Sequence, residues 1–277
     1  MPPDPLDLTG FSRPKLALSA CLGFLSCRYD GTGFLSPLPR RFFDWAEGRP
    51  FCPETQAGLG TPRTPIQWVL TGGRPTVVEL KNGQDHLPQL EKTAQCLLGA
   101  WGELEGLLLK ARSPSCALDD CPRYLPGTST PTNFGPGVLG KAALDSDRPW
   151  ILATEEQVKT PWGFELWAAG LFQLARLKAL PDNLLPDFHH RQTALLEGMG
   201  AKAALEGCRS DRREYTHRFA RAFTSPPEYQ VFLANLGLGN TSPELPLRLD
   251  QLAALLGVSG QSLNHPYPPS LTATRSP

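Results

Sequence analysis

The amino-acid sequence predicts an α/β fold with a mostly parallel sheet and crossover helices, followed by an all-α C-terminal domain. Short apolar runs alternate with helix-length amphipathic segments as far as about residue 157. From Pro161 onward strand-like segments cease and helical periodicity takes over. Strands that alternate with helices are usually joined by crossover connections, which favours a parallel sheet. We therefore expect two domains, residues 14–157 and residues 160–277.

The strand-like runs are short, and each leads into polar or turn-forming residues. Four of them predict the main sheet: Lys15–Cys21, Phe51-Cys52, 104–110 and Trp150–Ala153. Trp68–Leu70 and Thr76–Leu80 flank a Gly-Gly turn and predict a β-pair outside that sheet. The glycine- and proline-rich segment that follows the third strand is expected to remain a loop as far as Gly140.

Apolar residues at helical spacing predict the helices that connect these strands. One is expected over 37–48, with Gly48 as its end, and another over 85–101. In the C-terminal domain the same spacing predicts helices over 162–179, 184–206, 211–223 and 227–236.

Composition narrows the functional classes. The chain has 277 residues, 40% of them hydrophobic, and 27 basic residues balance 27 acidic ones, so any nucleic-acid contact must come from a local patch. The N-terminus lacks a basic region followed by an apolar run, and no segment is apolar enough to span a bilayer, so we expect a cytoplasmic protein without a membrane partner. Seven cysteines in such a chain indicate metal ligation, catalysis or burial rather than disulfides.

Three cysteines follow strand-like runs. Cys21, Cys52 and Cys116 are separated by far more residues than the local C-x-x-C pairs of zinc ribbons. Because the carboxyl ends of parallel strands meet at one edge of a sheet, we expect the three thiols to converge there. Three thiolates fit an iron–sulfur cluster with one unprotected iron, or a catalytic zinc with an open position. The alternative for each cysteine alone is burial as a small apolar side chain.

Polar residues accompany these cysteines. Glu54 stands two residues after Cys52, where a carboxylate could act as a general acid or base on a metal-bound group. Ser113 and Ser115 directly precede Cys116 and bring hydroxyls to the same rim. Two cations, Lys110 and Arg112, end the third strand; they either hold an anionic intermediate or solvate the strand end.

Four motifs, in this order, resemble those of the thiouracil desulfidase family: L-S-A-C-L-G-F-L-S-C-R-Y-D-G, F-C-P-E-T-Q-A-G-L-G-T-P-R-T-P, N-G-Q-D and L-L-L-K-A-R-S-P-S-C. The resemblance covers roughly residues 14–157. It implies a [4Fe-4S] cluster held by three cysteines. The fourth iron would take the sulfur of a thiocarbonyl, and water would replace that sulfur at carbon without net redox change.

Carried over to this sequence, the resemblance implies that Cys21, Cys52 and Cys116 are the cluster ligands. It makes Glu54 and Ser113 the acid/base pair. Cys27 also falls in the family pattern and is either an alternative ligand or a structural residue. The implied substrate is a thiolated pyrimidine, 2-thiouracil or thiouridine, either free or within transfer RNA.

Two departures from the family pattern keep other functions open. Ala117 stands where the family usually has glycine, which restricts the loop backbone, and His86-Leu87-Pro88 replaces a segment where the family tends to have threonine. The first alternative is a catalytically altered RNA-binding or accessory protein. The second is a zinc-dependent hydrolase that uses the same thiolates.

The C-terminal half loosely resembles the helical domain that is often fused to desulfidase domains, through D-F-H-H-R-Q-T-A-L-L-E-G-M-G and R-R-E-Y-T-H-R-F. It also carries a basic segment whose arginines lie near Tyr215 and Phe219, a combination suited to an RNA backbone with base stacking. Its candidate RNA-binding residues are Arg209, Arg212, Arg213, Arg218 and Arg221. The alternative is a solvated helix face with intrahelical pairs such as Glu214–Arg218.

Overall fold

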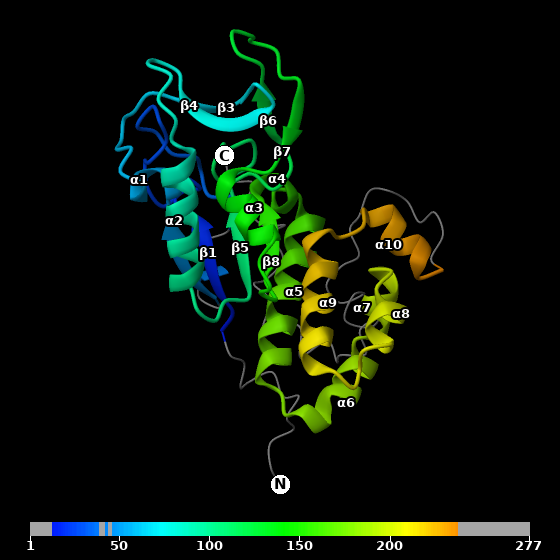
Figure 1. The fold of residues 1–277 in the computed structure, drawn as a ribbon. Helices are drawn as coiled ribbons and strands as arrows, with labels where there is room; N and C mark the ends of the chain where they lie inside the picture. The colour runs from blue at the N-terminus through cyan, green and yellow to red at the C-terminus, as the bar shows by residue number, and fades with distance from the viewer. Residues whose placement is uncertain (1–12, 39–41, 44–45, 238–277) are drawn as a thin grey trace, which may run out of the picture.

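The computed structural model describes residues 13–38, 42–43 and 46–237, and Figure 1 shows their arrangement. An N-terminal α/β region with a parallel sheet is followed by a helical C-terminal region. The predicted fold class is therefore confirmed.

Four parallel strands form the main sheet. They are β1 (Lys15–Ser19), β2 (Glu47–Phe51), β5 (Gly106–Leu109) and β8 (Ile151–Thr154), in the spatial order β2-β1-β5-β8. Every residue of β5 and β8 is buried, because this sheet is covered on both faces, and such strands appear in sequence as continuous apolar runs. Each predicted strand overlaps an observed one, and the carboxyl ends of the four share one edge. The second differs most from its prediction, because β2 ends at Phe51 and Cys52 instead occupies the N-cap position of α1.

A second sheet lies beyond that edge (Figure 1). It contains β3 (Ile66–Thr71), β4 (Arg74–Glu79), β6 (Cys121–Tyr124) and β7 (Asn133–Gly135), in the order β4-β3-β6-β7. The β3–β4 hairpin confirms the predicted β-pair. The expected loop up to Gly140 is wrong, because β6, β7 and helix α3 (Val138–Leu144) lie there. These elements are short and rich in proline and glycine, which hides their periodicity.

The connections of the α/β region differ in regularity. Helix α2 (Leu87–Ala100) is present as predicted, with Leu90, Ala94 and Leu97 buried on its inner face, and the short α1 (Pro53–Gln56) follows β2. Of the helix expected over 37–48, residues 39–41 and 44–45 lie outside the described residues. Phe42 and Phe43 have 3₁₀-helical conformation, and Gly48 lies inside β2 rather than at a helix end. Phe42 is nonetheless fully buried, so the apolar residue that suggested a helix at this position is a core residue outside a regular α-helix.

As far as residue 237, the C-terminal region contains α-helices and one 3₁₀ helix, η3. In chain order they are α4 (Glu155–Val158), α5 (Pro161–Ala179), η3 (Asp182–Leu184), α6 (Leu185–Arg191), α7 (Thr193–Gly198), α8 (Lys202–Glu206), α9 (Arg212–Thr224) and α10 (Tyr229–Asn235). The single helix expected over 184–206 is divided into α6, α7 and α8. One cause is Gly200, whose φ of 66° breaks the helical path before α8. Nowhere in the described ranges is there a helix long and apolar enough to cross a membrane.

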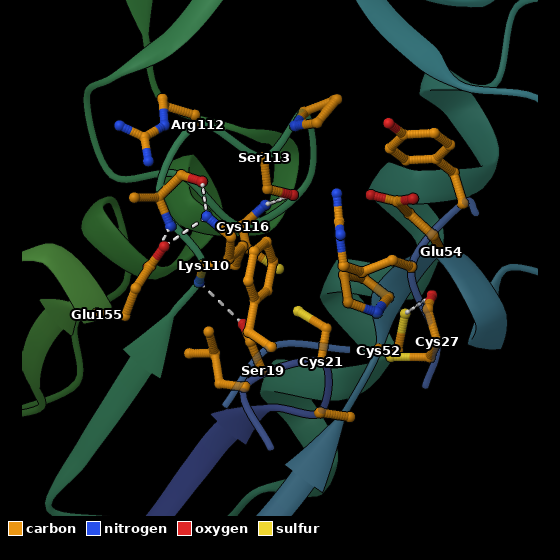
Figure 2. A pocket seen from close by; sticks show the side chains of 18 of the residues that line it. Ser19, Cys21, Cys27, Cys52, Glu54, Lys110, Arg112, Ser113, Cys116 and Glu155 are labelled. Atoms are coloured by element: carbon orange, nitrogen blue, oxygen red, sulfur yellow. Dashed lines mark hydrogen bonds and ion pairs between the residues drawn. The ribbon is translucent and has the colours of Figure 1, made fainter. Parts of the chain in front are cut away.

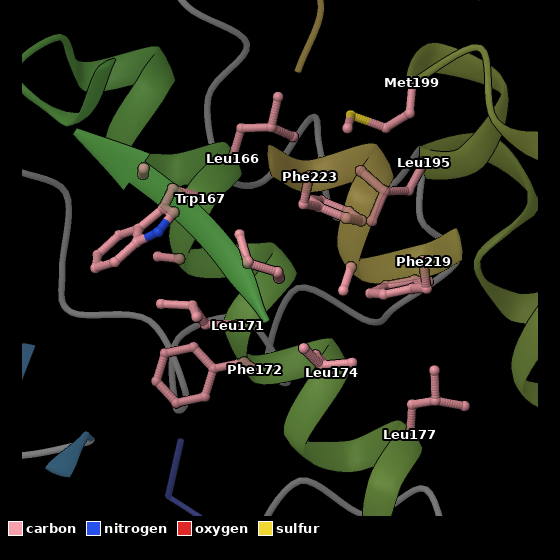
Figure 3. Close-up of a cluster of buried hydrophobic side chains, with 14 of the residues drawn as sticks. Leu166, Trp167, Leu171, Phe172, Leu174, Leu177, Leu195, Met199, Phe219 and Phe223 are labelled. Carbon is pink, nitrogen blue, oxygen red and sulfur yellow. The ribbon is translucent and has the colours of Figure 1, made fainter. Parts of the chain in front are cut away.

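The helical region packs directly on one face of the main sheet. Leu16 of β1 and Leu108 of β5 share a hydrophobic cluster with α5 and α9, which contribute Leu171 and Phe219 (Figure 3). These side chains are almost completely buried. The division into domains at residues 157–160 stays a prediction, since one apolar core runs across it.

One carboxyl within α5 makes the fold sensitive to pH. Burial raises the pKa of Glu165 from 4.5 to about 7, and its Oε2 has no hydrogen-bond partner among the described residues. The folded state therefore binds this proton more tightly than the unfolded chain. The stabilisation is complete below the unfolded pKa, near pH 4.5, and is lost as the pH rises through about 7.

We expect Glu165→Gln to remove this pH dependence. The free energy of unfolding of the wild-type chain should fall by about 2 kcal/mol more than that of the variant between pH 5 and pH 8, because solvent still reaches this half-buried carboxyl and weakens the full effect. Urea denaturation at a series of pH values measures this difference. Glu91→Gln, at an exposed position of α2, is the control. Parallel curves for wild type and Glu165→Gln would contradict the prediction.

Candidate active site and metal centre

A pocket of about 760 Å³ opens at the carboxyl edge of the main sheet, and each strand contributes to it. Cys21 follows β1, Cys52 follows β2, Cys116 lies in the loop after β5, and Glu155 follows β8. Figure 2 shows their side chains around this space. The sheet thus brings together the three cysteines that the sequence predicts to converge.

A fourth cysteine lines the same pocket. Cys27 is buried beside Cys52, whose thiol lies 4.0 Å from the Cys27 carbonyl oxygen (Figure 2). Thr55 donates a hydrogen bond to the Cys52 sulfur at 3.3 Å, one turn into α1. All seven cysteines of the chain are free thiols.

Burial dominates the electrostatics of these thiols. It raises the pKa of Cys21 to about 11, with a further contribution from Cys52, and that of Cys27 to about 12. The pKa of the deeply buried Cys116 is likewise raised well above its ordinary value, mainly by burial. The Cys21, Cys27 and Cys116 thiols are therefore protonated at neutral pH, and metal binding by any of them must release its proton.

The pocket carries the donors that an iron–sulfur cluster takes, which are thiols from three separate strand ends. Within the described ranges, no group of three His, Cys, Asp or Glu side chains is placed to hold a single metal ion. The pocket also supplies soft sulfur donors and apolar walls, including Leu22, Phe51 and Ile66.

Glu54 lies in the pocket wall and is held at both carboxylate oxygens. Its Oε2 accepts from Nε of Arg63 at 3.0 Å and also pairs with the Nη2 atom. Its Oε1 accepts from the hydroxyl of Ser115 at 2.9 Å. The same guanidinium donates through Nη1 to the carbonyls of Cys27 and Gly60. The carboxylate is thereby fixed between the loops that carry Cys27 and Cys116.

The two serines have different surroundings. Ser115 is completely buried, and its hydroxyl is committed to Glu54. Ser113 lines the pocket, and its hydroxyl oxygen accepts from the amides of Ser115 at 3.2 Å and Cys116 at 3.1 Å. Among the described residues the Ser113 O–H has no acceptor, so its proton is available to a group in the pocket.

The two cations after β5 are paired with the carboxylates that follow β8. Lys110 bonds Glu155 and the Ala111 carbonyl, and its ammonium lies 4.8 Å from the centre of the Phe34 ring. Arg112 pairs with Glu156 at 3.0 Å and is largely exposed. The structure therefore places Lys110 in the pocket wall and Arg112 at its outer rim.

A profile of the 2-thiouracil desulfurase family matches residues 16–156 of this chain, which contain every residue of the pocket described above. The chain belongs to this family. The match coincides with the predicted range of 14–157 and stops before α5.

Two proteins similar to this chain illustrate the match. An uncharacterized protein, YbbK, of Bacillus subtilis strain 168 is 29% identical over 108 residues, which cover 36% of this chain and 72% of the relative. Among solved structures, the [4Fe-4S]-dependent thiouracil desulfidase TudS is 28% identical, over 52% of this chain and 92% of that chain, with a TM-score of 0.39.

The departures from the family pattern are accommodated locally. Ala117 is buried, and Arg112 is the only non-glycine residue with a positive φ in the part of the chain that the structure describes, so alanine causes no backbone strain. The close contact at this point requires glycine at position 140 in α3, because a Cβ there would lie 1.9 Å from the Ala117 carbonyl oxygen. His86 precedes α2, and neither it nor its two followers line the pocket.

The basic segment near α9 differs from what the sequence suggests. Tyr215 and Phe219 are fully buried, so the expectation that they stack on RNA bases is wrong. The arginines lie among carboxylates, and the intrahelical pair Glu214–Arg218 is confirmed at 2.6 Å. The other pairs are Arg209–Glu206, Arg212–Asp182 and Arg213–Asp147. Arg221 lines a shallow hollow that Asp147, Asp211 and Glu214 also line.

Sequence reasoning missed Arg63 and Glu155 as site residues. Arg63 stands nine residues after Glu54 inside the motif T-P-R-T-P, and Glu155 directly follows the fourth strand. A basic residue inside a segment that lines a site, and a carboxylate at the carboxyl end of a strand, are the signals that could have found them.

We expect Arg63→Gln to destabilise the metal-free chain by about 2 kcal/mol, because it leaves the poorly exposed Glu54 carboxylate without its cation. Glu54→Gln combined with Arg63→Gln should cost less, since no isolated charge remains. Urea denaturation measures both. Lys141→Gln, which breaks an exposed pair with Asp145, is the control and should change stability by at most about 0.5 kcal/mol. Equal losses for the single and double variants would refute the argument.

Proposed function

We propose that this protein is a [4Fe-4S]-dependent desulfidase that replaces the sulfur of a thiolated pyrimidine by oxygen. The observation that carries the proposal is one pocket, in a member of the 2-thiouracil desulfurase family, that combines cysteines from three strand ends with a carboxylate fixed by Arg63. The net reaction is C=S + H₂O → C=O + H₂S, which involves no oxidant or reductant.

Cys21, Cys52 and Cys116 are the proposed cluster ligands. Each comes from a different strand end, whereas Cys27 lies next to Cys52 and shares its side of the pocket. We assign Cys27 to the wall around the ligands. When bound, the cluster supplies a soft Lewis acid that polarises the thiocarbonyl through its sulfur.

Glu54 and Ser113 are the proposed acid/base pair. With Oε2 held by Arg63 and Oε1 by Ser115, the Glu54 carboxylate is oriented to take a proton from the attacking water. Ser113 has both amide contacts on its oxygen and a free O–H, so it is placed to donate a hydrogen bond or relay a proton inside the pocket. Ser115 orients Glu54.

The charges of the pocket are already paired within the protein, which favours an uncharged substrate. Arg63, Lys110 and Arg112 each have a carboxylate partner, so a neutral 2-thiouracil or thiouridine suits the site. Transfer RNA as the carrier of the thiolated base is a further prediction, with contacts from Arg209, Arg212, Arg213, Arg218 and Arg221. A cytoplasmic location is consistent with seven free thiols, which persist in reducing compartments.

The full chain, purified without oxygen, should be brown, contain about four irons per chain, and release sulfide from 2-thiouracil. Iron and sulfide analysis, the visible spectrum and product chromatography measure this, with 2-thiouridine and thiolated transfer RNA as parallel substrates. A zinc-containing, colourless protein that hydrolyses other substrates would support the zinc alternative. Tight transfer RNA binding without sulfide release would support the RNA-binding alternative. Either result would overturn the proposal.

Single cysteine variants separate ligands from neighbours. Cys21→Ser, Cys52→Ser and Cys116→Ser should each lose most of the bound iron, because a three-ligand cluster has no spare protein ligand. Cys27→Ser should keep its iron, as should Cys208→Ser, a buried cysteine far from the pocket. Loss of iron in Cys27→Ser but not in one of the three would make Cys27 the ligand instead.

Glu54→Gln should keep the cluster and lower kcat by about 10²- to 10⁴-fold, as expected for removal of a general base. Ser113→Ala should lower kcat by at least about 10-fold with the same iron content. Steady-state kinetics on 2-thiouracil measures both, with the exposed Glu103→Gln as control. Full activity of Glu54→Gln would remove Glu54 from the mechanism.

A further inference from the structure

Trp68 of the second sheet makes a hydrogen bond to the loop that carries Cys116. Trp68 of β3 is almost fully buried, and its indole N–H donates to the carbonyl of Pro114 at 2.9 Å. Pro114 separates Ser113 from Ser115 and lies two residues before Cys116. Trp68 itself does not line the cysteine pocket.

The start of α3 also holds the loop. The amide of Val138 donates to the Pro114 carbonyl at 3.0 Å, and that of Leu139 to the Ser115 carbonyl at 2.7 Å. Close approach of the two segments requires glycine at 137, where a Cβ would lie 2.6 Å from the Ser115 carbonyl carbon. The Pro114 carbonyl thus accepts one hydrogen bond from each of two elements.

Trp68 is in turn fixed by Arg123 of the neighbouring strand. The guanidinium lies 4.7 Å from the centre of the indole ring and donates to the Pro136 carbonyl at 3.1 Å. Trp68 and Arg123 are register partners in the parallel pair β3–β6. A rigid sheet therefore presents the indole N–H to the loop, and the stacked cation restricts rotation of the ring.

We propose that Trp68 is a positioning residue for the desulfidase reaction, acting through the Pro114 carbonyl. The hydrogen bond fixes the position of the loop 113–116 relative to the pocket. The position of the loop in turn determines where the Ser113 hydroxyl and the Cys116 thiol lie within the pocket. It also keeps Ser115 within 2.9 Å of Glu54. The inference rests on the proposed function, and Trp68, which donates the hydrogen bond, lies in the second sheet and does not line the pocket.

Trp68→Phe tests this, because phenylalanine keeps an aromatic ring beneath Arg123 and lacks the N–H. Backbone amide exchange of the metal-free full chain should become about 3- to 10-fold faster at residues 115–117, whose amides bond Ser113. In the iron-loaded protein kcat should fall by a similar factor while KM for 2-thiouracil stays unchanged, since Trp68 does not touch the pocket.

Trp101→Phe is the matched control. This indole belongs to the same hydrophobic cluster and makes a tilted contact with Phe51 and an edge-to-face contact with Trp150. The Trp101→Phe variant should have unchanged amide exchange at residues 115–117 and an unchanged kcat. If Trp68→Phe does not fold, β-(3-benzothienyl)alanine at position 68 keeps the shape of the indole and removes only the N–H. Unchanged exchange at 115–117 in a folded variant would overturn the inference. Absence of desulfidase activity in the wild type would instead overturn the proposed function. The amide-exchange result would then still test whether Trp68 holds the loop.

Discussion

The site depends on the parallel order of three neighbouring strands. β1 pairs with β2 on one side and β5 on the other, so the segments that follow these strands must emerge at the same edge. Cysteines separated by tens of residues become neighbours for this reason alone. An antiparallel partner in place of β5 would send the Ser113–Cys116 loop to the opposite edge, away from Cys21, Cys52 and Glu54. The topology is therefore a condition for the chemistry.

The polar groups of the site are held by partners within the protein. Glu54 is held by Arg63 and Ser115, Lys110 by Glu155, and Ser113 by two amides of its own loop. Buried charges that have partners avoid the high cost of isolated ones, and fixed partners also keep a reacting group from turning away. The Ser113 proton has no acceptor among the described residues, and this proton and the pocket thiols are the groups that the proposed reaction uses.

The sequence predicted the main sheet and the three convergent cysteines because buried parallel strands appear as short apolar runs with chemistry at their carboxyl ends. It did not predict β6 and β7, where Pro122 and the glycines around them hide the alternation. The prediction that Tyr215 and Phe219 stack on RNA bases was wrong because neighbours in sequence can lie on opposite faces of an amphipathic helix. The two aromatic side chains point into the core, whereas the arginines next to them in sequence lie on the outer face. The partners of Glu54 depended on long-range packing, which no local pattern encodes.

The contact between helices and sheet limits how the protein can be divided. The family match ends at residue 156, but Leu16, Leu18 and Leu108 of the sheet are covered by side chains of α5 and α9. A fragment trimmed to the matched region would present this apolar face to water, and contiguous patches of that kind promote self-association. The C-terminal helices therefore act as a built-in solubilising cover for the catalytic region, and an expression strategy that removes them would produce aggregates.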